Sequence, residues 1–418
     1  MSNKQTANVV IVGGGVIGAS IAFHLAESGC KDVLLLDKGP LGSGTTPNAA
    51  GQTAHLTYKE SARQFVDYCS TFLQNFADKT GYAINFQASG SLRIAMTPTY
   101  TPQLQGYVET ADALQDDSVY LIDEQTAREL VPSLHFPESP ASILWNGGDG
   151  YIDEPKSVAL AYAAAARDRG VVIQTNTRVT KLCIEHDRIC GVQTNRGMIE
   201  AKHVVVAAGA WTRQLMQSRD ISVASVPVRH QAYVTVPMNT VDRAWPIVRV
   251  IEPQLYVRPH KGGMLVGGYG YRPLSFDMDD FPADFEIASL EADAIYYSRL
   301  QETAIHYFPM LADVPIAQER RGLPTVTPDA EMMVDEVEAI AGLVVATGCQ
   351  VAGVAYSAGI GRVAADVVLG QPCFLTEGLD SENGEVFAVD RFGDLYMHDD
   401  AKLRDHCEKA YGTMYWGK

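Results

Sequence analysis

The first forty residues alternate between short apolar runs and a segment with helical spacing. Residues 9–12 read V-V-I-V and residues 33–36 read V-L-L-L, and continuous apolar runs of this length are typical of buried strands. Between them, the apolar residues within 21–26 recur at helical spacing. The pattern therefore predicts a strand, a helix and a second strand.

Three glycines follow the first strand with the spacing G-x-G-x-x-G. Gly13 permits a tight turn, Gly15 lets the backbone approach a pyrophosphate, and Gly18 lets helix and strand pack closely. The helix N-terminus would present free N–H groups and a partial positive charge to that diphosphate. Asp37 stands 19 residues after Gly18, where its carboxylate can accept hydrogen bonds from ribose hydroxyls. Because an acid here disfavours a 2′-phosphate, the unit predicts binding of FAD or NAD rather than NADP.

Beyond this unit the helix and strand pattern is interrupted twice. Helices are predicted at residues 123–131, 155–170, 286–307 and 400–411, strands at 92–96, 171–175, 178–183, 189–192, 198–206, 232–236, 255–258, 264–266 and 343–346, and a loop at 145–150. We therefore predict an α/β fold in which a Rossmann-like nucleotide-binding domain is discontinuous. It comprises residues 1–85, 146–225 and 322–375; an antiparallel-sheet-rich (α+β) substrate domain takes 86–145 and 226–321, and a tail of residues 376–418 packs on the nucleotide-binding domain.

Composition narrows the class of protein. The net charge is −17, with 50 acidic and 33 basic residues, which disfavours nucleic acid as a partner. No apolar run reaches the roughly 20 residues of a membrane span, and the short polar N-terminus does not predict a signal peptide. The seven cysteines are scattered without a C-x-x-C pair, so we expect reduced thiols in a cytoplasmic protein and no metal site.

Several further motifs occur in a specific order. They are S-G-T-T-P-N-A-A-G at residues 43–51, G-D-G-Y-I-D at 148–153, V-V-V-A-A-G-A-W at 204–211, P-V-R-H-Q at 227–231, L-Y-V-R at 255–258, G-M-L-V-G at 263–267, T-P-D at 327–329, R-F at 391–392 and A-Y-G-T-M-Y at 410–415. Together they resemble the D-amino-acid-oxidase superfamily of FAD enzymes, within it the dimethylglycine/sarcosine dehydrogenase branch. The resemblance covers nearly the whole chain and ends where that branch's folate-binding domain would begin, so we do not expect folate to capture a one-carbon fragment within this sequence.

The resemblance implies an FAD-binding domain and a set of residues that contact the cofactor. These are Gly13, Gly15, Val16, Ile17, Gly18, Asp37, Lys38, Ser43, Thr45, Thr46, Asn48, Ala50, Gly51, Gln52, Val179, Ala208, Gly209, Trp211, Gly348, Gly353 and Val354. In that branch a histidine carries flavin covalently, and Asn48 stands at its place here. The cysteine that sarcosine oxidases use falls near Gly322. Because neither residue can form the bond, the FAD is expected to be non-covalent.

The resemblance also implies amine oxidation, in which hydride passes from the α-carbon to flavin N5 and the imine is hydrolysed. We expect Tyr256 to be a wall of the active site and a hydrogen-bond donor, the alternative being a half-buried strand tyrosine. Arg258 would share its face of the strand and bind a substrate carboxylate, or pair with a surface acid. Tyr269 and Tyr271 are candidates for an aromatic cage around an alkylated amine.

Two histidines complete the candidate catalytic residues, and they bear on which substrate class the protein oxidises. His230 and His55 could tune the protonation of an amine, or serve structural roles. An alcohol or 2-hydroxy-acid substrate remains open, and it would need one of them as a general base. A non-catalytic flavin-holding subunit and a nicotinamide-dependent dehydrogenase are the other readings. The electron acceptor is oxygen or a carrier protein, and the oligomeric state and the amine itself are not predicted.

Overall fold

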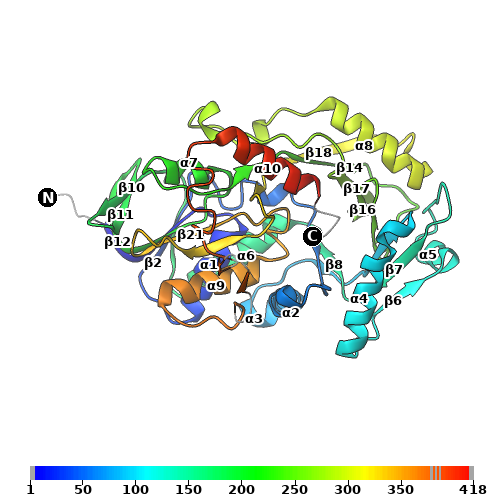
Figure 1. The fold of residues 1–418 in the computed structure, drawn as a ribbon, viewed down its shortest axis with the longest axis horizontal. Helices are drawn as coiled ribbons and strands as arrows, with labels where there is room; N and C mark the ends of the chain where they lie inside the picture. Colours follow the sequence, from blue (N-terminus) through cyan, green and yellow to red (C-terminus); the bar gives the residue numbers. More distant parts are fainter. Residues whose placement is uncertain (1–4, 377–379, 382–383, 386, 414–418) are drawn as a thin grey trace.

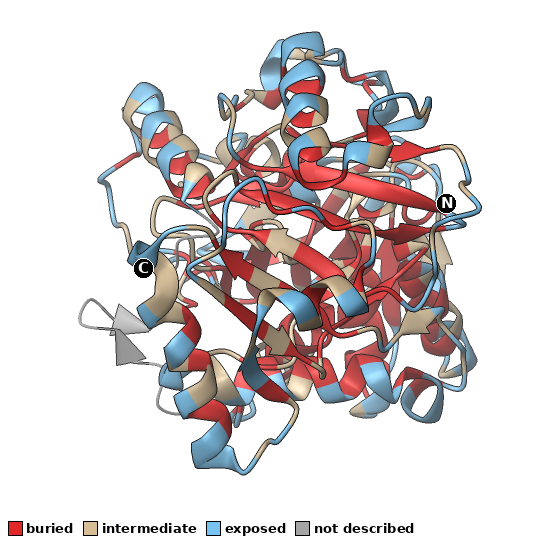
Figure 2. Cartoon of the chain, turned by 90° about the vertical axis from the view of Figure 1, so that its right-hand side faces the viewer, coloured by how far each residue is buried: buried red, intermediate tan, exposed pale blue. Residues whose placement is uncertain are grey.

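The computed structural model describes residues 5–376, 380–381, 384–385 and 387–413. Two eight-stranded sheets dominate these residues and lie toward opposite ends of the long axis of the molecule (Figure 1). Their strands are largely buried, whereas the exposed residues gather on the outer faces of helices and in loops (Figure 2). The mixed α/β architecture confirms the predicted fold class.

The continuous apolar runs of the sequence build the centre of the first sheet. Strand β1 (Gln5–Val12) runs parallel to β2 (Val33–Leu36) on one side and to β12 (Gly197–Val206) on the other. Val9 and Ile11 pack into one hydrophobic cluster, Val10 and Val12 into another on the opposite face. Because successive side chains point to opposite faces, a strand that is covered on both sides must be apolar throughout.

The other members of this sheet extend it in both directions. They are β9 (Val172–Gln174), β10 (Val179–Glu185), β11 (Arg188–Thr194), β20 (Met333–Glu336) and β21 (Leu343–Thr347). The helices around it are α1 (Val16–Glu27), α2 (Arg63–Gln74), α3 (Phe76–Thr80), α6 (Pro155–Asp168), α7 (Thr212–Gln217) and α9 (Ser357–Leu369). Helices α6 and α9 both pack against α1, so one face of the sheet carries a helical layer (Figure 1).

The second sheet is antiparallel except where β5 pairs with β15. In spatial order its strands are β18 (Ile316–Gly322), β14 (His230–Thr235), β17 (Gly263–Gly268), β16 (Leu255–His260), β15 (Ile247–Val250), β5 (Ser91–Ala95), β7 (Ser142–Asn146) and β6 (Val119–Ile122). Helix α8 (Ala294–Tyr307) covers one face, where Leu255 and Val257 join its cluster. Tyr256 points to the other face.

Smaller elements lie outside the two eight-stranded sheets. They are β3 (Gln52–Thr53), β4 (Phe86–Gln87), β8 (Gly150–Ile152), β13 (Val226–Pro227), β19 (Thr325–Val326), β22 (Asp380–Ser381), β23 (Gly384–Glu385), α4 (Thr101–Leu114), α5 (Glu124–Leu130) and α10 (Asp400–Gly412). Helix α10 packs on β13 and β19, and Asp400 at its start forms an ion pair with Arg213 of α7. At its other end Gln254 Nε2 donates to the carbonyl oxygen of Gly412, so the tail also reaches the second sheet.

Two predicted elements are wrong in their bounds. The helix expected over 286–307 begins only at Ala294, because Asp293 caps it by accepting from the backbone N–H of Tyr296, and residues 287–289 form a separate 3-10 turn. The loop expected over 145–150 is partly strand, since Trp145 pairs with Leu92 at the end of β7 and β8 starts at residue 150. A local cap therefore decided the first boundary, and strand pairing with a distant segment decided the second.

The segments predicted for the nucleotide-binding domain contribute the strands of the first sheet, and those predicted for the substrate domain contribute almost all of the second. The division into domains itself stays a prediction. The last two residues of the tail motif, 414 and 415, and the three residues after them lie outside the described residues. None of the described helices combines the length and apolar character that a membrane crossing requires.

Candidate functional site

The turn after β1 is so tight that two of the three motif glycines have no space for a side chain. Gly13 has a φ of 112°, and a Cβ there would overlap the carbonyl oxygen of Ala207. A Cβ on Gly18 would overlap the carbonyl oxygen of Gly13. At Gly15, which caps α1, a Cβ would stand 3.5 Å from Thr46 Oγ1. This glycine keeps the backbone open toward a ligand rather than toward the protein.

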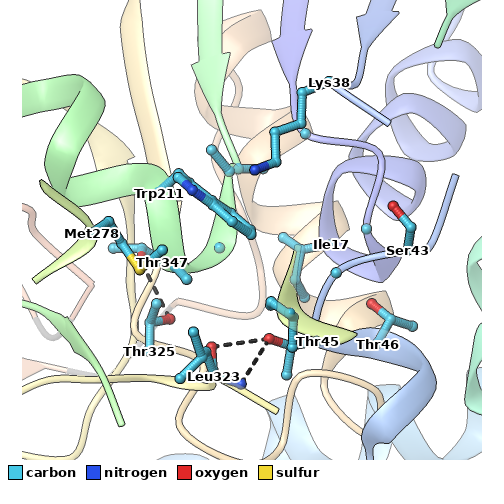
Figure 3. Close-up of a pocket in the computed structure, with 18 of the residues that line it drawn as sticks. Ile17, Lys38, Ser43, Thr45, Thr46, Trp211, Met278, Leu323, Thr325 and Thr347 are labelled. Atoms are coloured by element: carbon cyan, nitrogen blue, oxygen red, sulfur yellow. Dashed lines mark hydrogen bonds between the residues drawn. The ribbon is translucent and has the colours of Figure 1, made fainter. Parts of the chain in front are cut away.

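The N-terminus of α1 is suited to bind an anion. Its first turn contains no acidic residue, so no carboxylate of the helix itself neutralises its positive end. The backbone N–H of Val16 donates to Thr46 Oγ1 at 3.2 Å. Ile17 and Thr46 lie on the same side of the cavity (Figure 3). The first N–H groups of a helix have no partner within the helix, and a diphosphate could satisfy them.

Asp37 shapes the glycine turn from the end of β2. Its Oδ2 accepts from the N–H of Gly14 at 2.6 Å, and its Oδ1 accepts from the N–H of Gly39 at 2.7 Å. Burial raises the pKa of this carboxyl above its ordinary value. Each carboxylate oxygen keeps a second lone pair, so a ribose hydroxyl could still donate to it. That second role stays a prediction.

These elements open on one cavity of about 880 Å³, a volume in the upper range of ligand sites. Predicted cofactor residues that line it are Gly13, Gly15, Val16, Ile17, Asp37, Lys38, Ser43, Thr45, Thr46, Asn48, Ala50, Val179, Ala208, Gly209, Trp211, Gly353 and Val354. The same cavity reaches His230 and Tyr269 of the predicted catalytic set. A continuous cavity therefore connects the anion-binding turn with the aromatic wall of the second sheet.

Four predicted cofactor residues do not line the cavity, and each has a structural task. Gly18 lies in the first turn of α1, against the carbonyl oxygen of Gly13. Gly51 has a φ of 71° and accepts from the N–H of Ile152. Gln52 Oε1 accepts from Arg249 Nε at 2.8 Å. Gly348, with a φ of 66°, donates its N–H to Thr325 Oγ1 at 3.0 Å.

Sequence reasoning missed a segment that closes one side of the cavity, residues 278–287, called the strap below. Lys38 Nζ lies 3.5 Å from the centre of a Trp211 ring (Figure 3). It also donates to the carbonyl oxygen of Phe285 at 2.8 Å. Arg178 Nη1 donates to the carbonyl oxygen of Ala283, and Gln214 Nε2 to that of Met278. Three side chains around the first sheet thus hold the strap by its backbone. Burial lowers the pKa of Lys38.

The two positions that the sequence resemblance singled out for covalent attachment of flavin, Asn48 and Gly322, meet in space. A Cβ at Gly322 would stand 3.6 Å from the Cβ of Asn48 and 3.1 Å from Thr45 Cγ2. Thr45 Oγ1 donates to the carbonyl oxygen of Leu323 at 3.0 Å and joins the two segments (Figure 3). Asn48 and Gly322 both line the cavity. Neither offers an imidazole or a thiol at this place.

His230 is the polar centre of the aromatic wall. Its Nε2 lies 2.7 Å from the hydroxyl of Tyr256 and its Nδ1 lies 2.6 Å from the hydroxyl of Tyr411. The ring of Tyr269 lies tilted against the imidazole, with the ring centres 4.9 Å apart. Burial lowers the pKa of His230 to about 4, so the imidazole is neutral at pH 7. Tyr256, expected as the wall itself, does not line the cavity and stands behind His230.

Arg258 has a different environment from both alternatives drawn from the sequence. Its side chain is fully buried, so it does not pair with a surface acid. Nε donates to the carbonyl oxygen of Ala50 at 2.7 Å, and Nη1 lies 3.3 Å from the buried Asp153. Arg320 is also buried, and its Nη1 donates to the carbonyl oxygen of Ala49 at 3.2 Å. Two buried cations with one buried carboxylate therefore lie directly behind the cavity wall.

Two other predicted catalytic residues do not line the cavity. Tyr271 packs under the guanidinium of Arg299, 4.3 Å from its ring centre, on the helix-covered side of the second sheet. His55 Nε2 lies 2.9 Å from Asp116 Oδ2, in a half-exposed pair. The structure therefore does not bring Tyr271, His55 or Arg258 together with His230 at the cavity wall.

The strap and Tyr411 carried weak signals in the sequence. Apolar residues recur in the acidic stretch around the strap, and this pattern distinguishes the strap from an ordinary solvated loop. Tyr411 belongs to the tail motif, but only folding could place it beside a residue 181 positions earlier. Among the described residues, no three histidine, cysteine or acidic side chains gather as metal ligands.

The geometry fits an FAD. A turn without side chains and a helix N-terminus could bind the diphosphate, and the adjoining cavity could hold the other parts of the cofactor. The family model for FAD dependent oxidoreductases, DAO, matches residues 8–367. The chain is 32% identical over 381 residues to the mitochondrial dimethylglycine dehydrogenase of Homo sapiens, covering 89% of this chain and 43% of that protein. It is 29% identical over 407 residues to the 4-methylaminobutanoate oxidase (formaldehyde-forming) of Paenarthrobacter nicotinovorans, covering 97% and 48%.

A solved structure agrees with these sequence matches. L-proline dehydrogenase from P. horikoshii superimposes with a TM-score of 0.77 at 23% identity, over 88% of this chain and 95% of that one, and it shows the same fold. The chain spans less than half the length of the two curated relatives. The family model nevertheless extends over most of this sequence, from β1 to α9. The chain belongs to the DAO family of FAD-dependent oxidoreductases, and FAD is its cofactor.

Proposed function

We propose that this protein oxidises the C–N bond of a secondary or tertiary N-methyl amine or amino acid. Two relatives are named for dimethylglycine and 4-methylaminobutanoate, both of which are N-methyl amino acids. The structural observation that carries the proposal is His230, a neutral ring at the cavity wall with both nitrogens hydrogen-bonded to tyrosines. Such a wall offers no strong base, and amine oxidation needs none.

The residues of the chain would bind and orient, while bound FAD supplies the hydride acceptor. The glycine turn and the N-terminus of α1 would hold the diphosphate, and Asp37 the ribose. The rings of His230 and Tyr269 would form an apolar wall for the alkyl groups of the amine. Water then hydrolyses the oxidised amine to formaldehyde and the demethylated product.

The buried charges behind the wall support the same substrate class. Arg258 and Arg320 together carry one positive charge more than Asp153 balances. Burial, followed by the charge of Arg320, lowers the pKa of Arg258 to about 10, which shows that the two cations repel each other. A positive field disfavours the ammonium form of a nearby amine and favours a carboxylate. The site would therefore select the neutral amine group of an anionic molecule, which is the reactive form.

Oxidation of a 2-hydroxy acid is the main alternative, and one arrangement argues against it. An alcohol must lose its hydroxyl proton to a base as hydride leaves. His230 has both nitrogens engaged, and His55 is paired with Asp116 away from the cavity. A third reading, a flavin-holding subunit without catalysis, predicts FAD that no substrate reduces.

We further propose that FAD is held without a covalent bond, because Asn48 and Gly322 occupy both attachment positions. Denaturing the purified yellow protein and filtering it should release all flavin into the filtrate. Flavin that stays with the denatured chain would contradict this part of the proposal.

The acceptor of the electrons is proposed to be oxygen or a carrier protein. The seven cysteines are free thiols, which supports a reducing, cytoplasmic compartment.

The test of the function is anaerobic reduction of the bound FAD. The holoprotein is mixed with dimethylglycine, sarcosine and 4-methylaminobutanoate, and with the hydroxy acids glycolate and lactate as matched carboxylates without nitrogen. We expect one or more of the N-methyl amino acids to bleach the 450 nm band, with formaldehyde formed in stoichiometric amount. Bleaching by hydroxy acids alone would establish the alternative. Full FAD content without bleaching by either set would favour the non-catalytic reading.

A further inference from the structure

Arg320 is a buried cation whose guanidinium is held by two uncharged acceptors. The residue is 3% exposed. Nη1 donates to the carbonyl oxygen of Ala49 at 3.2 Å, and Nη2 lies 3.1 Å from His260 Nε2. The buried Nε has no partner among the described residues. Because a buried guanidinium that loses an acceptor is costly, each of the two contacts helps to fix its place.

His260 connects this guanidinium to the buried carboxylate of Asp153. His260 lies on β16 and is 4% exposed. Its Nε2 faces Arg320 Nη2, and its Nδ1 lies 3.4 Å from Asp153 Oδ1. The imidazole therefore stands between a cation and an anion, with one ring nitrogen turned toward each.

The chemistry of the two partners leaves one arrangement of hydrogens on this ring. A guanidinium only donates, and an ionised carboxylate only accepts. Nε2 must therefore carry the lone pair, and the ring hydrogen resides on Nδ1, directed toward Asp153. A doubly protonated ring would oppose an Nε2–H to an N–H of Arg320.

The protonation states of both groups agree with this arrangement. Burial lowers the pKa of His260, and the charges of Arg320 and Arg258 add to the lowering against the opposing bond to Asp153, so the ring is neutral at pH 7. Burial would raise the pKa of Asp153, but the hydrogen bond from His260 and the charge of Arg258 hold it below its ordinary value. The carboxyl is therefore ionised at pH 7.

Arg320 reaches the wall of the cavity from behind. Its bond to Ala49 lies next to the bond from Arg258 Nε to the carbonyl oxygen of Ala50, at 2.7 Å. Residues 48–50 line the cavity, so two successive carbonyl oxygens of this wall segment are held by two buried guanidinium groups. If Arg320 lost its second acceptor, only the bond to Ala49 would hold it among the described residues.

We propose that His260 is a positioning residue for FAD. As the neutral Nδ1–H tautomer it accepts from Arg320 and fixes the guanidinium on Ala49, so that residues 48–50 keep the place at which they line the cavity. His260 does not line the cavity itself and acts through Arg320. This role concerns the bound FAD and is the same for an amine and for a hydroxy acid.

The tautomer of His260 can be measured in the native protein. The FAD-bound full chain is labelled with 15N at its ten histidines, and the ring nitrogen shifts are read by NMR. The His260 signals are assigned from their loss in His260→Gln. We expect a protonated Nδ1 and an unprotonated Nε2. A protonated Nε2, alone or together with a protonated Nδ1, would overturn the proposal.

Two amide side chains separate the acceptor toward Arg320 from the donor toward Asp153. The amide of His260→Gln reaches the place of Nε2 and can accept from Arg320, whereas the shorter amide of His260→Asn stays near the place of Nδ1. In titrations of the apoprotein with FAD we expect native affinity in His260→Gln. His260→Asn and His260→Leu should bind FAD about tenfold more weakly, the order of one lost hydrogen bond. Native affinity in His260→Leu, or equal weakening in all three variants, would overturn the positioning role.

Arg320→Met tests whether His260 acts through Arg320. Without the guanidinium the acceptor of His260 holds nothing, so His260→Leu should weaken FAD binding little further in the Arg320→Met background. Losses that add in the double variant would contradict this route. His406→Leu on α10 is the matched control, because its Nδ1 is also hydrogen-bonded, at 2.7 Å from the hydroxyl of Tyr396. It should bind FAD with native affinity.

A spectroscopic readout separates positioning from a loss of stability. The visible circular dichroism of bound FAD reports the surroundings of the flavin ring, and the melting temperature of the apoprotein reports the fold. At saturating FAD we expect an altered spectrum in His260→Leu and the native spectrum in His260→Gln. A lower melting temperature of His260→Leu with native spectrum and affinity would show a structural role alone and overturn the proposal. These measurements need no substrate, so their result is independent of whether an amine reduces the flavin.

Discussion

At the scale of single residues, the sequence was most informative where a position depends on its immediate neighbours. Gly13 and Gly18 are required by a turn whose own backbone leaves no room for a side chain. Arg258 was misjudged, because its partners Asp153 and Ala50 come from segments far from β16. The requirement for glycine at a position follows from the local backbone conformation. The partner of a charged side chain follows from the tertiary structure.

Gly15 provides a test at this scale. In Gly15→Ala the new Cβ would meet Thr46 Oγ1 only at 3.5 Å, so the protein should fold with an unchanged melting temperature of the FAD-free form. The methyl group would project toward the diphosphate. Because the backbone at this glycine must approach the pyrophosphate closely, we expect FAD binding to weaken by about tenfold or more.

Affinity for FAD is read by titration of the apoprotein with flavin fluorescence. The control is Gly106→Ala, in α4, where a Cβ would meet the ring of Tyr58 no closer than 3.7 Å. It should bind FAD normally. Equal affinity in Gly15→Ala and the native protein would place the diphosphate elsewhere.

At the scale of elements, the long apolar runs and the helical periodicities gave most strands and helices correctly. The start of α8 was missed because the capping bond of Asp293, and not apolar spacing, sets it. The strap was missed for a different reason: its structure depends on Lys38, Arg178 and Gln214, which hold its carbonyl oxygens. A segment held through its backbone leaves little trace in its own side chains.

The strap should slow the release of FAD, because it closes one side of the cavity. Lys38→Met removes the bond to Phe285 and the contact with Trp211, each worth about 1 kcal/mol. We expect FAD to dissociate about five- to thirtyfold faster, measured by transfer of flavin to an excess of a flavin-binding scavenger.

A lysine far from the cavity serves as the matched control for this experiment. The Nζ of Lys402, a residue of α10, lies 5.6 Å from the ring centre of Tyr396, so Lys402→Met also removes a cation from an aromatic ring. Its FAD should dissociate at the native rate. An unchanged rate in Lys38→Met would show that the strap does not retain the cofactor.

At the scale of the whole molecule, buried charges join the segments between the two sheets. Asp149 is fully buried after β7 and accepts from the N–H of His55, from Ser91 and from Arg249. Burial alone would raise the pKa of this carboxyl, but the guanidinium groups of Arg249 and Arg93, together with the hydrogen bonds from His55 and Ser91, hold it below its ordinary value of 3.8. The carboxylate therefore stabilises the fold at neutral pH.

Asp149→Asn should lower the free energy of unfolding by about 3–5 kcal/mol at pH 7, because it leaves buried guanidinium charge uncompensated. Since the pKa is lower in the folded state, the stabilisation is complete above pH 3.8 and is lost only as pH falls through the folded value. The difference from the native protein should stay constant between pH 5 and pH 8 and shrink below about pH 4.

Urea unfolding of the apoprotein over this pH range measures both effects. Asp405→Asn is the control, because Asp405 forms an exposed pair with Lys409 on α10 and should contribute less than about 1 kcal/mol. A difference that grows between pH 5 and pH 8 would contradict the assigned pKa direction.

The sequence by itself determined the parts of this protein that are encoded over short distances. The turn from β1 to α1, the acid after β2 and the apolar strands of the first sheet follow from backbone sterics, helix polarity and burial on two faces. Tertiary structure alone decided which residues surround His230. Tyr256 and Tyr411 meet there because α10 lies beside the second sheet, which carries both His230 and Tyr256. The hydrogen bonds of a buried imidazole depend on what the fold places beside it.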